Sequence, residues 1–199
     1  MTARRSESGF RAVLAVAAVM AILGAASIAA QASAKEIEGV RFADEIRAGA
    51  TALRLNDVGL MRYRYVIKAY VAALYLGDGA PSPDPLADVP KRLEIEYFYA
   101  IQAPGFVNAT NQGIADNVPP ETLAALRPRI DELNALYRDV QPGDRYTLTY
   151  LPGTGTELAL NGTPLGTIEG ADFAAAVFAI WLGPRAIDAS LKAQLLGRS

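Results

Sequence analysis

Four polar side chains with the chemistry to hold an anion occupy alternate positions between residues 62 and 70. Arg62, Arg64, Lys68 and Tyr70 all fall on even-numbered positions, and a β-strand would place them on one face because its side chains alternate between two faces. Guanidinium groups beside a tyrosine hydroxyl can bind a carboxylate or phenolate at the mouth of an apolar cavity. The pattern also fits a solvated strand face. Arg62, Arg64 and Tyr70 are therefore candidate ligand-binding residues.

A second polar group lies a little further along the chain. Asn108, Thr110, Asn111 and Gln112 follow one another closely. Their side chains can hydrogen-bond a ligand, or they can cap helices and form turns. Asn108 and Asn111 are kept as further candidates for ligand binding.

The chain contains neither cysteine nor histidine. Histidine is the usual general base near neutral pH and the commonest metal ligand. Ser-His-Asp and Cys-His catalysis are therefore excluded within this chain, and so are most zinc sites and His-ligated haem. We predict no catalytic residue, no metal site and no cofactor.

The segments that must position these side chains predict strands, helices, a strand meander and further helices. That order is typical of an α+β fold with a largely antiparallel sheet and helices on one face. The aromatic side chains of the helix at 173–182, Trp181 among them, are expected in the core. Strands are expected at 36–42, 53–57, 62–76, 92–99, 145–151, 156–160 and 164–169, with a hairpin at Asn161-Gly162. Helices are expected at 104–117, from Pro119-Pro120 onward, at 173–182 with Asp172 as cap, and at 187–196.

Residues 1–34 show the three parts of a secretory signal peptide. Arg4, Arg5 and Arg11 precede an uncharged apolar run at 12–30, and Ala32-Ser33-Ala34 offers small residues for cleavage. A run of about 19 apolar residues is also long enough for an uncleaved membrane anchor. We predict cleavage, a periplasmic or secreted location, and one domain over 35–199.

The charge of that domain argues against a nucleic-acid partner. The whole chain has a formal net charge of −2, and the first 34 residues hold three Arg and one Glu, so their removal changes −2 to −4. There is no basic stripe of the kind that binds a phosphate backbone. No stable membrane span is expected after cleavage, and the predicted partner is an apolar small molecule.

Several short segments, taken in order and spacing, resemble the bacterial chalcone isomerase-like family. This family groups exported proteins that are related to plant chalcone isomerases and fatty-acid-binding proteins. The resemblance covers nearly all of 35–197 and implies an open-faced β-sandwich, in which a large antiparallel sheet packs against a layer of helices with a ligand cleft between them. The segments are Gly59-Leu60, 68–76, Pro142-Gly143-Asp144, Leu160-Asn161-Gly162, 168–173 and Ile180-Trp181-Leu182-Gly183.

The resemblance also maps the polar roles of the plant isomerase onto this chain. Most of those roles fall on residues that lack the required polar group, which argues against flavonoid isomerisation. The Arg role falls on or near Arg62, with Arg64 as second candidate, and the first Thr role falls on Tyr70. The Tyr role falls near Phe106, and the Asn role falls near Gly113, with Asn111 as a neighbour. The second Thr role falls on Ile180.

These observations together predict a non-catalytic binding protein for an apolar, acidic small molecule such as a fatty acid. The head of the ligand would contact Arg62 or Arg64 together with Tyr70. Two alternatives stay open: an isomerase or lyase of the chalcone-isomerase type that uses Arg electrostatics, and a structural or interaction protein with a vestigial cleft.

Overall fold

The computed structural model describes residues 33–64, 66–77 and 84–198, which belong to one structural unit. The predicted signal peptide lies almost wholly outside the described residues and stays a prediction. In the part of the chain that is described, no helix is both long and apolar enough to cross a membrane.

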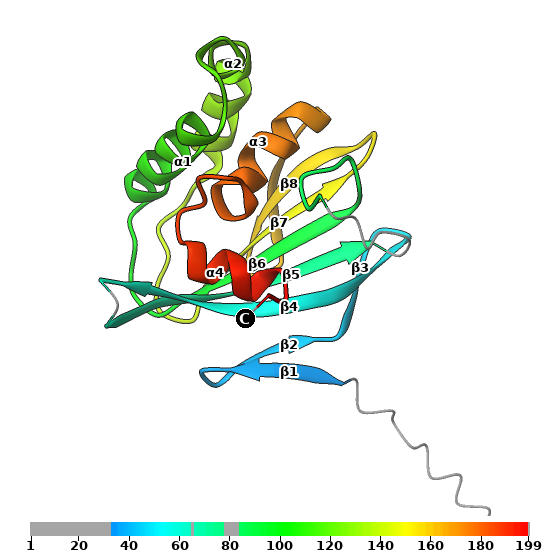
Figure 1. Cartoon of the computed structure of the whole chain (residues 1–199), viewed down its shortest axis with the longest axis vertical. Coiled ribbons are helices and arrows are strands. Elements are labelled where there is room, and N and C mark those ends of the chain that lie inside the picture. Colours follow the sequence, from blue (N-terminus) through cyan, green and yellow to red (C-terminus); the bar gives the residue numbers. More distant parts are fainter. Residues whose placement is uncertain (1–32, 65, 78–83, 199) are drawn as a thin grey trace, which may run out of the picture. The chain divides into compact units, whose positions relative to one another are not determined.

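A seven-stranded antiparallel sheet forms the frame of the molecule (Figure 1). Each strand pairs with the next one along the chain, so the strand order in space is the order in sequence. This arrangement confirms the α+β class and the large antiparallel sheet. The strands are β3 (Glu45–Ala48), β4 (Thr51–Tyr63), β5 (Ile67–Gly77), β6 (Lys91–Tyr97), β7 (Arg145–Leu151), β8 (Gly155–Leu160) and β9 (Thr163–Ile168).

Helices cover one face of this sheet (Figure 1). They are α1 (Ala103–Asn117), α2 (Pro120–Leu136), α3 (Ala171–Leu182) and α4 (Ala189–Leu195). Helices α1 and α3 approach closely at Gly113, where an added Cβ would lie 2.9 Å from the side chain of Ile180. A larger residue at 113 would push the two helices apart.

The opposite face of the sheet is covered by a separate hairpin of β1 (Ala34–Ile37) and β2 (Val40–Ala43). Strand β5 shows both faces: Ala72 and Leu74 pack toward the helices, whereas Val71 and Tyr75 pack into the cluster that contains β2. A strand that is buried on both faces reads as a continuous apolar run.

The single strand predicted at 36–42 is wrong, because the chain turns back within it. Glu38 and Gly39 both adopt positive φ angles, 53° and 82°, which close the tight β1–β2 turn. By contrast, the hairpin predicted at Asn161-Gly162 is confirmed, since the two residues have φ angles of 51° and 79° and join β8 to β9. Paired positive φ angles match the right-handed twist of the flanking strands.

The continuous strand predicted at 62–76 is also wrong. Strand β4 ends at Tyr63, Arg64 adopts a φ of 49°, and β5 begins at Ile67. In the pairing of β4 with β5, Met61 pairs with Tyr70 but Arg62 pairs with Lys68. Ala69 is therefore left without a partner in a β-bulge. A bulge interrupts the strict alternation of faces, and this one decides which side chains reach the site.

The predicted cap of the third helix also needs correction. Gly170 occupies the N-cap of α3, and Asp172 lies in the first turn of the helix. Its carboxylate accepts two hydrogen bonds from Arg129 of α2, each 2.7 Å long. Asp172 therefore ties two helices together rather than capping one.

Candidate functional site

A cavity of about 280 Å³ lies between the helix-facing side of the sheet and the helices. Strands β4 to β8 contribute its floor, and α1, α3 and the α3–α4 loop contribute its roof. Its lining is uncharged throughout the described residues. Aromatic side chains dominate it: Tyr63, Tyr70, Tyr97, Phe106, Tyr137, Tyr146 and Trp181.

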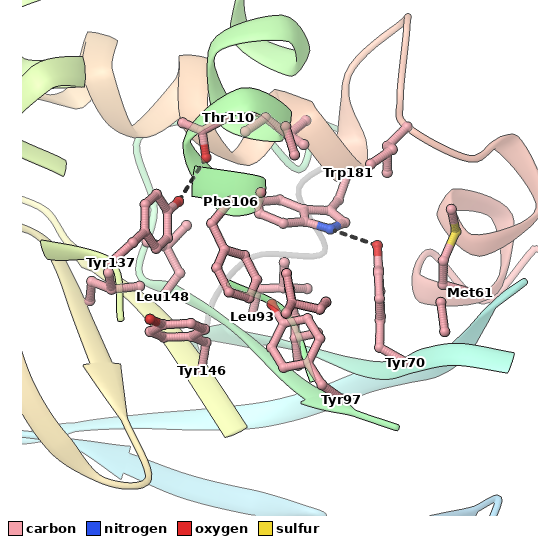
Figure 2. Close-up of a pocket in the computed structure, with 18 of the residues that line it drawn as sticks. Met61, Tyr70, Leu93, Tyr97, Phe106, Thr110, Tyr137, Tyr146, Leu148 and Trp181 are labelled. Atoms are coloured by element: carbon pink, nitrogen blue, oxygen red, sulfur yellow. Dashed lines mark hydrogen bonds between the residues drawn. The ribbon is translucent and has the colours of Figure 1, made fainter. Parts of the chain in front are cut away.

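The aromatic rings interlock around Tyr97 and Phe106 (Figure 2). The ring centroid of Tyr97 lies 5.3 Å from that of Phe106 and 5.7 Å from that of Tyr70, both in edge-to-face geometry. Phe106 stacks on Tyr137 with a centroid distance of 5.4 Å. Such contacts are worth about 0.5–1.5 kcal/mol each beyond area burial, so they stabilise this wall of the cavity.

Two of the tyrosine hydroxyls in the wall are already engaged. The Tyr146 hydroxyl donates to the Arg138 carbonyl oxygen at 2.9 Å and accepts from the Arg138 backbone N–H at 2.7 Å. The Tyr137 hydroxyl shares a hydrogen bond of 2.8 Å with Thr110 (Figure 2), while burial raises its pKa to about 12. These two hydroxyls hold the cavity wall in place.

The hydroxyls of Tyr70 and Tyr97 retain hydrogen-bonding capacity. Tyr70 accepts a hydrogen bond of 3.2 Å from the Trp181 indole N–H (Figure 2), and its own proton meets no acceptor among the described residues. Tyr97 is only 5% exposed, and no described group hydrogen-bonds its hydroxyl. Burial raises the pKa of both phenols. They therefore stay protonated near neutral pH and can act as donors toward a ligand.

Four of the cavity's lining residues reach solvent, Tyr63, Gly105, Ala109 and Ile187, and the two large side chains among them mark the mouth of the cavity. Tyr63 at the end of β4 is 53% exposed, and Ile187 in the α3–α4 loop is 46% exposed. The Arg64 guanidinium lies over the Tyr63 ring, 5.4 Å from its centroid. A positive charge therefore lies beside the mouth, outside the cavity lining.

The sequence model of the family described as "Chalcone isomerase-like" matches residues 34–197, which is most of the chain. This protein belongs to the chalcone isomerase-like family. Among proteins with curated descriptions, no sequence matches this member of the family.

Solved structures place the same fold in a plant protein. The chain resembles the crystal structure of a fatty-acid binding protein from Arabidopsis thaliana, with a TM-score of 0.66 and 14% sequence identity. The match covers 82% of this chain and 96% of the plant chain. At this identity the likeness shows that the two proteins share the chalcone isomerase-like fold.

The sequence pattern predicted one shared face for the basic residues and Tyr70. This prediction is wrong for Arg62 and Lys68. The Lys68 ammonium binds Glu38 in the β1–β2 turn, on the side of the sheet away from the helices. Arg62 pairs directly with Lys68, and paired residues of antiparallel strands share a face. The bulge at Ala69 is the cause, since it leaves Tyr70 on the cavity side. Arg62 thus lies outside the cavity lining of this chalcone isomerase-like protein.

The two predicted asparagines also lie outside the lining. Asn108 is exposed on α1, and the Asn111 side-chain oxygen accepts a hydrogen bond of 3.1 Å from Asn134 of α2. Thr110 lies between them and does line the cavity. Of the five predicted site residues, Tyr70 reaches the cavity and Arg64 lies at its mouth.

Three residues onto which the resemblance maps family roles do meet in the cavity: Tyr70, Phe106 and Ile180. Sequence reasoning missed Tyr97, whose alternation with Leu93 and Ile95 marks it as a residue of a buried strand face but not as one with a free hydroxyl. It also assigned Trp181 to core packing, although its indole lines the cavity and donates to Tyr70. The sequence does not indicate the free hydroxyl of Tyr97 or the cavity position of Trp181, because both depend on how strands and helices pack together.

Proposed function

We propose that this protein is a non-catalytic binding protein for an apolar small molecule that carries one oxygen-bearing polar group. The observation that carries the proposal is the uncharged aromatic cavity lined by two phenols, Tyr70 and Tyr97, that still have protons to donate. An apolar pocket with a few convergent polar groups is the usual form of a small-molecule site. The plant neighbour, a fatty-acid binding protein, supports the same ligand class.

A fatty acid fits this site as its neutral acid. Burying an ionised carboxylate without a partner costs far more than burying a hydrogen-bonded neutral group, and the described lining offers no cation. Desolvation would raise the carboxyl pKa, so the acid would bind protonated, with its carbonyl oxygen facing the two phenol protons. The proposed ligand can therefore be an acid, and its head group needs no contact with Arg62 or Arg64.

Absence of catalysis is part of the same proposal. Proton abstraction near neutral pH needs a group with a pKa close to that pH. The described lining holds no carboxylate or amine, and burial moves the tyrosine pKa values away from neutrality. The cavity is suited to binding and poorly suited to general base chemistry.

An exported location completes the proposal, and it rests on the signal-peptide pattern of residues 1–34. Expression of the full chain followed by fractionation and intact-mass measurement tests it. We expect the recovered protein outside the cytoplasm to begin near Lys35. A full-length chain retained in the cytoplasm would contradict export.

Equilibrium titration of the full chain with matched alkyl ligands tests the binding function. The panel is an alkane, a fatty alcohol, a fatty acid and its methyl ester of equal chain length. We expect the oxygen-bearing ligands to bind more tightly than the alkane, and Arg62→Ala and Arg64→Ala to change those affinities by less than about threefold, which corresponds to less than about 1 kcal/mol. Failure of every ligand to bind, or turnover of a chalcone that Arg62→Ala abolishes, would overturn the proposal.

A further inference from the structure

Apolar side chains gather on the surface at the tip of the β4–β5 hairpin. Tyr63, Val66 and Ile67 are 53%, 76% and 41% exposed, and Tyr63 pairs directly with Ile67 across the hairpin. We call these three residues the hairpin patch. Clustered apolar side chains on the surface commonly mark an interaction site.

Positive charge surrounds the hairpin patch. Arg62 and Arg64 flank Tyr63 and are both exposed, and the Arg64 guanidinium lies over the Tyr63 ring. Lys68 follows the patch, and its ammonium is bound to Glu38. An anionic lipid surface attracts such a combination, because basic groups bind the headgroups while aromatic and aliphatic side chains enter the interface.

The hairpin patch is continuous with the mouth of the cavity. Tyr63 belongs both to the patch and to the cavity lining, and exposed Ile187 lines the same cavity. A lipid surface in contact with the hairpin tip would therefore meet the opening through which an apolar ligand enters.

We propose that the β4–β5 hairpin tip docks on an anionic lipid bilayer through Tyr63, Val66 and Ile67, with Arg62 and Arg64 contacting the headgroups. The mouth of the cavity then faces the bilayer, and an apolar ligand passes between membrane and cavity without crossing bulk water. This inference goes beyond ligand binding, since the hairpin patch can dock whether or not the cavity is filled.

A fluorescent probe on the hairpin tests the docking directly. The chain has no cysteine, so Val66→Cys can be labelled at a single site with an environment-sensitive dye in the full chain. With vesicles of phosphatidylcholine and phosphatidylglycerol we expect a blue shift of the dye emission that weakens as salt is added. Ala124→Cys serves as the matched control and should show no shift. Ala124 is exposed on α2, a helix that lies far from the hairpin tip (Figure 1).

Charge reversal then separates docking from ligand binding. Arg62→Glu in the Val66→Cys chain should weaken vesicle binding at least fivefold, since one basic residue near an anionic surface is worth about 1 kcal/mol. Arg127→Glu on α2 should leave it unchanged, and neither change should alter ligand affinity without vesicles. Equal shifts at positions 66 and 124, no shift at 66, or a dimer in lipid-free buffer that Val66→Asp dissociates would overturn the proposal.

Discussion

At the scale of single residues, the function depends on which tyrosine hydroxyls are already bonded. Tyr137 and Tyr146 are held by Thr110 and by the Arg138 backbone, whereas Tyr70 and Tyr97 have protons to offer. The four share one cavity and one chemistry. Only their hydrogen-bond partners distinguish the structural hydroxyls from those available to a ligand.

Removal of the Tyr97 oxygen should reduce selectivity for oxygen-bearing ligands. Tyr97→Phe is expected to weaken binding of a fatty alcohol roughly fivefold to tenfold, the value of about one hydrogen bond, and to leave alkane binding unchanged. Calorimetric titration of both ligands measures the difference.

Tyr75→Phe provides the matched control for this experiment. Tyr75 is buried on the opposite face of the sheet, and its hydroxyl has no hydrogen-bond partner among the described residues. The substitution should leave ligand affinity unchanged and keep the stability equal or raise it by up to about 1 kcal/mol. Equal losses of alcohol affinity in the two variants would show that Tyr97 makes no ligand contact.

At the scale of elements, hairpin geometry determines which side chains reach the site. The bulge at Ala69 places Tyr70 on the cavity face and leaves Lys68 on the other face.

The tight turn into β8 restricts which residue can occupy position 155. Gly155 has a φ of 117°, and a Cβ there would lie 2.5 Å from the Ile168 carbonyl oxygen.

Gly155→Ala should therefore destabilise the fold far more than Gly153→Ala. Gly153 also has a positive φ, 76°, but nothing lies within 4 Å of an added Cβ. We expect a loss of about 1–2 kcal/mol for Gly153→Ala from the left-handed backbone alone, and at least about 3 kcal/mol for Gly155→Ala. Urea denaturation of both variants measures this, and similar losses would refute the steric account.

Sequence patterns could predict much of the fold because they report local structure. The Asn161-Gly162 turn and the alternation of Leu93 with Ile95 indicate their strands directly. The bulge at Ala69 could not be predicted, since it is defined by the pairing between β4 and β5. The candidate basic residues were consequently assigned to one face, although Arg62 and Tyr70 lie on opposite faces.

At the scale of the whole molecule, a buried lysine connects a loop to the core. Lys91 is fully buried, and its ammonium donates to the carbonyl oxygens of Pro85 at 2.9 Å and of Ala87 at 2.6 Å. It also lies 5.5 Å from the Phe178 ring centroid. Burial lowers its pKa to about 8.

This lowered pKa makes the stability depend on pH. Between about pH 8 and pH 10 the unfolded chain keeps the Lys91 proton while the folded chain releases it, so the free energy of unfolding rises with pH. We expect the stability of the wild type, measured relative to Lys91→Met, to increase by roughly 1–2 kcal/mol over that range. Parallel pH profiles for the two proteins would contradict this.

The central claim is that an uncharged cavity binds an apolar ligand with its polar group in neutral form. The most direct test compares the affinities of decanoic acid and decanol between about pH 5 and about pH 7, where the free acid is ionised. The account predicts that the affinity for the acid falls by up to about tenfold per pH unit while the affinity for the alcohol stays constant. An acid affinity that is independent of pH and is lost in Arg64→Ala, or no binding of either ligand, would contradict it.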